Sequence, residues 1–112
     1  MGHTQSVEAV RTERNDGTVD KIRDVCMKII DQGEWADYVD LQSLVMRELE
    51  ESNIKPHTVV VENIDHPAFN HWRYLNNIRV RSVDLSRYGK NYVVIKRLKT
   101  ALHYNFRLIV AW

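Results

Sequence analysis

Two groups of side chains in the second half of the chain have chemistry suited to nucleic acid. The first group shares one face of a predicted helix over residues 66–77, at helical spacings i, i+3, i+4 and i+7: Asn70, Arg73, Tyr74 and Asn77. Arginine pairs bidentately with guanine and asparagine with adenine, so a face that carries both types suits base edges. We therefore predict that this helix face contacts bases.

The second group lies on a predicted β-hairpin and on the turn that joins its strands. Arg87 and Lys90 flank the turn glycine, with Tyr88 offering a flat ring beside them. The other members of the group are the cations Arg79, Arg81, Lys96, Arg97 and Lys99. Cations in such positions contact phosphates, which sets the orientation of a complex and not its sequence preference. Six phosphate contacts would give a log–log salt dependence with a slope of about −5 on B-DNA.

The charges are divided unequally along the sequence. Residues 1–69 hold 7 Lys/Arg and 14 Asp/Glu, whereas residues 70–112 hold 9 Lys/Arg and one acid, Asp84, although the net charge is only +1. This asymmetry favours a surface in the basic part that faces a polyanion. Two alternatives stay open, because the two parts could neutralise each other within the fold or the acidic part could dock on a protein partner.

Metal and catalytic chemistry find little support in the sequence. His66 and His71 are five residues apart, which separates them by about 140° around a helix, whereas a metal-binding histidine pair needs the i, i+4 spacing. An acid–base role for either histidine with Asp65 stays open, since catalytic groups are assembled in space. The chain has no Gly-rich phosphate loop and no G-x-S-x-G or H-E-x-x-H motif. We predict no enzyme activity, no metal and no cofactor.

The composition is that of one globular domain of 112 residues. No apolar run approaches the roughly 18 residues of a membrane span, and the first residues lack the apolar core of a secretory signal. The single cysteine, Cys26, excludes an internal disulfide and a zinc site built from cysteines. We therefore expect a cytoplasmic protein that does not bind membranes and that is free to form oligomers.

The elements that position these residues are predicted from apolar periodicity. Residues 1–17 are polar and are expected to be a mobile N-terminal arm, with a single domain over 18–112. Helices are predicted from Thr18 to Gly33, from Asp40 to Ser52 and from His66 to Asn77; strands over 78–85, 92–98 and 102–112; and a short strand or extended linker over 57–63. Cys26 falls on an apolar helix stripe and is expected to be a buried hydrophobe.

One feature of the second helix conflicts with helix electrostatics. Glu48, Glu50 and Glu51 lie near its C-terminus, where the helix dipole disfavours negative charge. Nothing in the sequence explains why three acids stand there.

The order of elements resembles that of the winged helix, a variant of the helix-turn-helix, over residues 18–98. The resemblance implies an α+β fold in which three helices precede a three-stranded antiparallel sheet. The helix over 66–77 would lie in the major groove and the turn over 86–91 would be the wing. The connection of about a dozen residues before that helix and the added final strand depart from the family.

We therefore expect a non-enzymatic regulatory or accessory protein that binds nucleic acid, most simply duplex DNA. The alternative is a small protein-interaction module or inhibitor, of the kind that viruses and mobile elements use to block a host protein. Its docking surface would come from the acidic residues 1–69.

Overall fold

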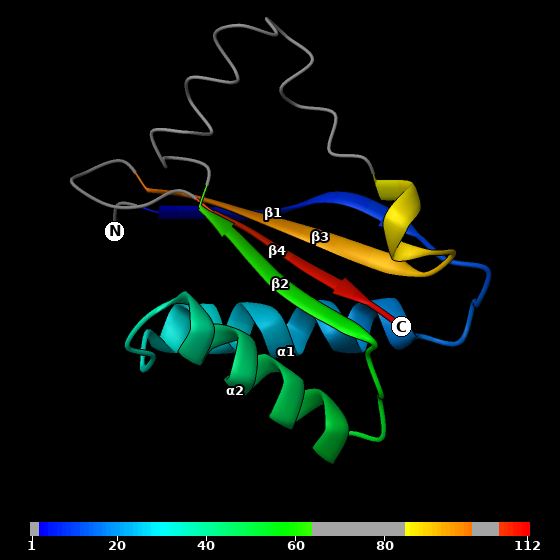
Figure 1. Cartoon of the computed structure of the whole chain (residues 1–112), viewed down its shortest axis with the longest axis horizontal. Coiled ribbons are helices and arrows are strands. Elements are labelled where there is room, and N and C mark those ends of the chain that lie inside the picture. The colour runs from blue at the N-terminus through cyan, green and yellow to red at the C-terminus, as the bar shows by residue number, and fades with distance from the viewer. Residues whose placement is uncertain (1–2, 64–84, 100–105) are drawn as a thin grey trace, which may run out of the picture.

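The computed structural model describes residues 3–63, 85–99 and 106–112 of the chain. In chain order the elements are β1 (His3–Arg11), α1 (Thr18–Gln32), α2 (Tyr38–Glu51), β2 (Thr58–Asn63), the 3-10 helix η2 (Leu85–Tyr88), β3 (Tyr92–Lys99) and β4 (Phe106–Ala111). The strands form one antiparallel sheet in the order β1-β3-β4-β2. Both helices cover the same face of this sheet (Figure 1). The described residues thus form an α+β domain in two layers.

This topology shows that the winged-helix prediction was wrong. A strand precedes the helices, because residues 3–11 of the predicted mobile arm form β1 and pair with β3. The other edge of β3 pairs with β4, so β3 has no free edge for the hairpin partner predicted over 78–85. The predicted helix over 66–77 and residues 78–84 lie outside the described residues. A sheet of three strands that follows three helices does not describe this chain.

Helix α1 occupies the predicted residues, and its N-cap is Gly17 in the left-handed conformation. Just before it, the Asp16 Oδ1 accepts hydrogen bonds from the Thr18 backbone N–H at 3.1 Å and hydroxyl at 2.6 Å. These hydrogen bonds lower the pKa of Asp16. Gly33 ends the helix in the left-handed conformation at φ 65° and donates its N–H to the Ile29 carbonyl, as its position predicts.

Helix α2 begins with a reciprocal pair of side-chain caps. The Asp37 carboxylate accepts the Asp40 N–H at 2.7 Å, and the Asp40 carboxylate accepts the Ala36 N–H at 2.8 Å. These bonds satisfy N–H groups that a helix start leaves without partners. The buried side of α2 carries Leu41, Val45 and Leu49 at steps of four residues, with Leu44 partly buried beside them.

The core lies between the two helices and the sheet. Cys26 is fully buried there and burial raises its pKa to about 12, which confirms that it is a buried hydrophobe. Trp35 and Tyr38 close one end of the core against Phe106, with ring centroids 5.9 and 5.5 Å from the Phe106 ring. The final strand is confirmed as a packing strand, because β4 lies in the middle of the sheet and all six of its residues are buried.

Candidate functional site

The structure places only part of the predicted nucleic-acid interface. Six of its residues lie outside the described part of the chain: Asn70, Arg73, Tyr74, Asn77, Arg79 and Arg81. Lys99 ends strand β3. The side chains that can be compared with the prediction are those of Arg87, Tyr88, Lys90, Lys96 and Arg97, and they do not share one surface.

Tyr88 does not present its ring to solvent as predicted. The residue is only 5% exposed and packs on the sheet face opposite the helices, against Val94, Ile109 and Ala111. Burial is the main cause of a raised pKa for its hydroxyl, and the charge of Glu62 raises that pKa further. The Arg87 guanidinium lies 5.3 Å from the Tyr88 ring centroid. A base therefore has no tyrosine ring here on which to stack.

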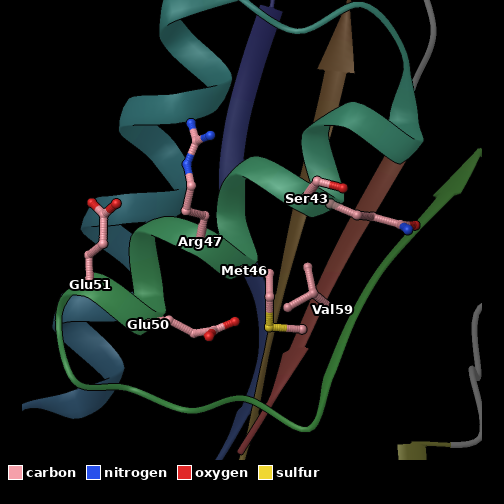
Figure 2. Close-up of a pocket in the computed structure, with 7 residues that line it drawn as sticks. Ser43, Met46, Arg47, Glu50, Glu51 and Val59 are labelled. Atoms are coloured by element: carbon pink, nitrogen blue, oxygen red, sulfur yellow. The ribbon is translucent and has the colours of Figure 1, made fainter.

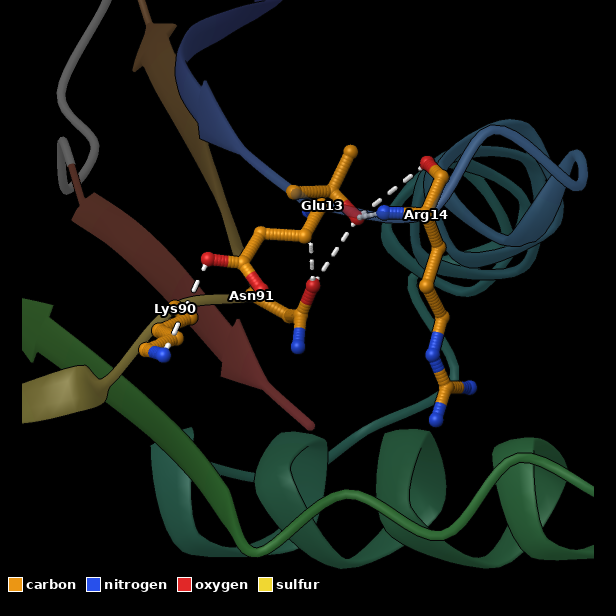
Figure 3. Close-up of polar contacts among 5 residues, drawn as sticks. Glu13, Arg14, Lys90 and Asn91 are labelled. Atoms are coloured by element: carbon orange, nitrogen blue, oxygen red, sulfur yellow. Dashed lines mark hydrogen bonds and ion pairs between the residues drawn. The ribbon is translucent and has the colours of Figure 1, made fainter.

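The turn before β3 holds the connection between β1 and α1 (Figure 3). The Asn91 side-chain oxygen accepts the Thr12 hydroxyl at 2.9 Å and the Glu13 N–H at 3.1 Å. Lys90 lies 3.9 Å from the Glu13 carboxylate, and both side chains are largely exposed. The predicted wing thus makes structural contacts with a segment far away in the sequence.

Lys96 and Arg97 point to opposite faces of the sheet, because neighbouring residues of a strand alternate. Arg97 faces the helices, is 7% exposed and lies 5.8 Å from the centre of the Phe106 ring. Burial lowers the pKa of Arg97, while the negative charge of Asp31 acts in the opposite direction. Lys96 lies on the other face and is 3.9 Å from the Glu8 carboxylate.

Glu8 is also the partner of Arg107, a residue that the sequence analysis did not single out. Arg107 is 3% exposed and donates to the two Glu8 oxygens at 2.6 and 3.4 Å, from β4 to β1 across the intervening strand β3. A register shift between Val7 and Ala9 leaves Glu8 as the extra residue of a β-bulge. This bulge gives β1 the carboxylate that faces both cations.

These contacts match the neutralisation alternative for the described part of the chain. Lys90, Lys96 and Arg107 form ion pairs with Glu13 or Glu8, and Arg97 lies in the field of Asp31. In each case a cation from the basic part meets an acid from the acidic part. Lys96, Arg97 and Arg107 are thereby drawn away from a common surface for phosphates, whereas Arg87 and Lys90 stay exposed.

A different surface feature lies between α2 and the edge strand β2 (Figure 2). It is an open depression of about 660 Å³, which we call the α2–β2 groove, and it is lined by Gln42, Ser43, Met46, Arg47, Glu50, Glu51 and Val59. Met46 and Val59 are the apolar residues of its lining, and we call them the apolar floor of the groove. The Gln42 side-chain oxygen accepts the Val61 backbone N–H at 2.8 Å, so it links α2 to β2.

The groove carries net negative charge at the end of α2. Glu48, Glu50 and Glu51 occupy the last turn of α2, which holds no basic residue, and Arg47 of the preceding turn is the one cation among the described residues of the groove lining. Among the residues that the structure describes, no ion pair involves these three acids. Two of the three unexplained acids, Glu50 and Glu51, therefore line the groove beside Met46 and Val59, whereas Glu48 is not part of its lining.

The described residues contain no group of side chains suited to bind a metal ion. Within the described ranges no three His, Cys, Asp or Glu side chains converge on a point where an ion could bind. The ring of His57 instead makes a 2.8 Å contact from Nδ1 to the Thr58 hydroxyl.

No described helix has the length and apolar character that crossing a membrane requires. Comparison of the chain with family models, curated proteins and solved structures finds no match.

Proposed function

We propose that this protein is a non-enzymatic protein-binding module that docks on a basic partner through the α2–β2 groove. The observation that carries the proposal is the acidic last turn of α2 beside an apolar floor. Negative charge at a helix C-terminus costs stability in the free protein, and a cationic partner would remove that cost. The floor of Met46 and Val59 adds apolar area, which gives affinity beyond charge attraction.

The same observations argue against the described cations as a nucleic-acid surface. Lys96 and Arg97 are on opposite faces and Tyr88 is buried, so among the members whose side chains the structure describes only Arg87 and Lys90 are exposed. Two phosphate contacts would give a shallow salt slope of about −2. Binding to nucleic acid stays a prediction, because six residues of the predicted interface lie outside the described part of the chain.

The proposal includes a place of action in the cytoplasm and no catalytic step. The single thiol, Cys26, is buried in the core and is unsuited to covalent chemistry, since burial disfavours its thiolate. The sequence left open that the acidic residues 1–69 dock on a protein partner. We propose that this docking surface lies on α2 and β2.

The test is a titration with a labelled peptide in which lysine and valine alternate, monitored by fluorescence anisotropy at low and at physiological salt. We expect binding that weakens with salt and that falls at least tenfold in Glu50→Gln/Glu51→Gln. The matched control is Asp20→Asn/Asp24→Asn, which removes the same charge from exposed positions on α1. Equal loss in both variants, or binding to duplex DNA and not to the peptide, would overturn the proposal.

A further inference from the structure

The strand that forms one wall of the groove has a free edge among the described residues. β2 pairs with β4 on one side, and no described strand pairs with its other side. In an antiparallel strand the N–H and C=O of one residue point to the same side and alternate from residue to residue. Because the Val61 N–H bonds to Gln42 and not to β4, Val59 and Val61 turn their backbone groups to this free edge.

One of these edge groups, the Val61 N–H, is hydrogen-bonded to the side chain of Gln42 on the neighbouring helix α2. Its amide oxygen takes the place that a carbonyl of an adjacent strand would take, at 2.8 Å from the Val61 nitrogen. Unlike a paired strand, a glutamine side chain can rotate away from this position without breaking any backbone hydrogen bond of α2. The Val61 N–H is thus satisfied in the free protein, and Gln42 can give up this position to a carbonyl of a bound strand.

We infer that the groove binds an extended basic segment of its partner as an added strand on β2, an inference that rests on the docking function proposed above. Extended peptides bind sheet edges in this way, with main-chain hydrogen bonds for affinity and alternate side chains for specificity. Charge complementarity identifies the occupant. Side chains on the helix side of the new strand would meet the floor of Met46 and Val59 and the carboxylates of Glu50 and Glu51.

The opposite face of the added strand would meet a further acid. Glu62 lies on β2 one residue from Val61, so its side chain is on the face opposite the groove. No described ion pair involves Glu62. Basic side chains on the helix side of the added strand would meet Glu50 and Glu51, and basic side chains on the other side would meet Glu62, so a basic segment finds carboxylates on both faces.

The experiment compares two isomers of the lysine–valine peptide that differ only in the positions of backbone N-methyl groups. One isomer is methylated on every valine and the other on every lysine, so only one of them keeps the N–H groups that would face β2. We expect their affinities for the full chain to differ at least tenfold, and the unmethylated peptide to bind as well as the better isomer.

Gln42 provides the internal control for the edge. Gln42→Ala removes the competing acceptor, so we expect the unmethylated peptide to bind about threefold to tenfold more tightly. Gln32→Ala, the same substitution at an exposed position of α1 outside the groove lining, is expected to leave affinity unchanged. A structural defect at position 42 would weaken binding instead.

The outcomes separate this inference from the function on which it rests. Equal affinity of the two methylated isomers, together with a loss in Glu50→Gln/Glu51→Gln, would overturn strand addition and leave docking by charge in place. No binding of the unmethylated peptide would overturn both. The chain could instead form a stable dimer in solution that becomes tighter in Gln42→Ala and that the peptide does not dissociate. This result would contradict the inference, because the edge would then bind a second copy of the chain.

Discussion

Neutralising the acids of the groove should stabilise the free protein while it weakens binding. In Glu50→Gln/Glu51→Gln two negative charges leave the last turn of α2, which holds no basic residue. Each such charge costs about 0.3–1 kcal/mol at low ionic strength, and exposed positions take the lower half of that range. The two together give a gain of about 1 kcal/mol.

Part of this gain is lost because Arg47 stands three and four residues before the two acids. Neighbours at these spacings attract by about 0.2–0.5 kcal/mol even where no close ion pair forms. The net gain is then about 0.5 kcal/mol, which for a domain of this size raises Tm by roughly 2–4 °C. The effect should shrink with added salt, because both terms are screened.

The assay is thermal unfolding by circular dichroism at low and at physiological salt. Asp20→Asn/Asp24→Asn again serves as the control, because Asp20 lies in the first turn of α1, where a carboxylate is favourable. This control is expected to lower Tm, although it changes the net charge by the same amount. A fall of Tm in Glu50→Gln/Glu51→Gln, or a rise of equal size in both variants, would refute the electrostatic reasoning.

Four further outcomes are expected for the fold. Glu8→Ala removes the bidentate partner of the buried Arg107 and should lower the free energy of unfolding in denaturant by about 1–3 kcal/mol. Glu13→Ala removes only the exposed pair with Lys90 and should change that free energy by less than about 0.5 kcal/mol. Equal effects of the two variants would contradict the expectation that the buried pair contributes more. Gly33→Ala should cost about 1 kcal/mol through its left-handed φ of 65° alone, since no atom lies within 4 Å of the added Cβ, and an unchanged midpoint in urea would contradict this. Deleting residues 108–112 removes most of the central strand β4, so the product should lack a cooperative unfolding transition. Burial raises the pKa of Cys26 from 9.0 to about 12. The neutral thiol therefore stabilises the fold below pH 9, and this contribution to the free energy of unfolding should decline as the pH rises from about 9 towards 12. Rapid alkylation of the folded protein at pH 8 would contradict this, because it would show that the thiol is accessible.

The helices and the final strand could be predicted because each carries its own periodic signal. Residues Ile22, Cys26, Ile29 and Ile30 mark the buried side of α1, and the alternation of Phe106, Leu108 and Val110 marks the helix side of β4. Such patterns depend only on local sequence. The ends of α1 and α2 follow from capping residues that also act locally.

The first strand could not be predicted in the same way. β1 is an edge strand, and among its described side chains only Val7 packs on the main core, so its sequence has little apolar alternation. It becomes a strand through pairing with β3, about 90 residues further along the chain, and the Glu8–Arg107 contact spans 99 residues. The winged-helix prediction used the order of local elements and had no information on this pairing.

The candidate site was visible in the sequence only as an inconsistency. Three acids at the end of α2 contradict helix electrostatics, and local rules that fail without compensation often mark function. What the sequence could not supply was the neighbour of those acids, because Val59 and the free edge of β2 meet α2 only in the folded chain. The exposed ring assumed for Tyr88 was wrong for the same reason, since its burial depends on β3 and β4.

The most direct test of binding at the α2–β2 groove is an NMR titration of the isotope-labelled chain with the unmethylated lysine–valine peptide. We expect the backbone amide shifts to change mainly at residues 42–51 of α2 and 58–63 of β2, with the largest change at the Val61 N–H as it leaves Gln42. Shifts confined to the region of Arg87 and Lys90, or a response to duplex DNA there and none to the peptide, would contradict the proposed site.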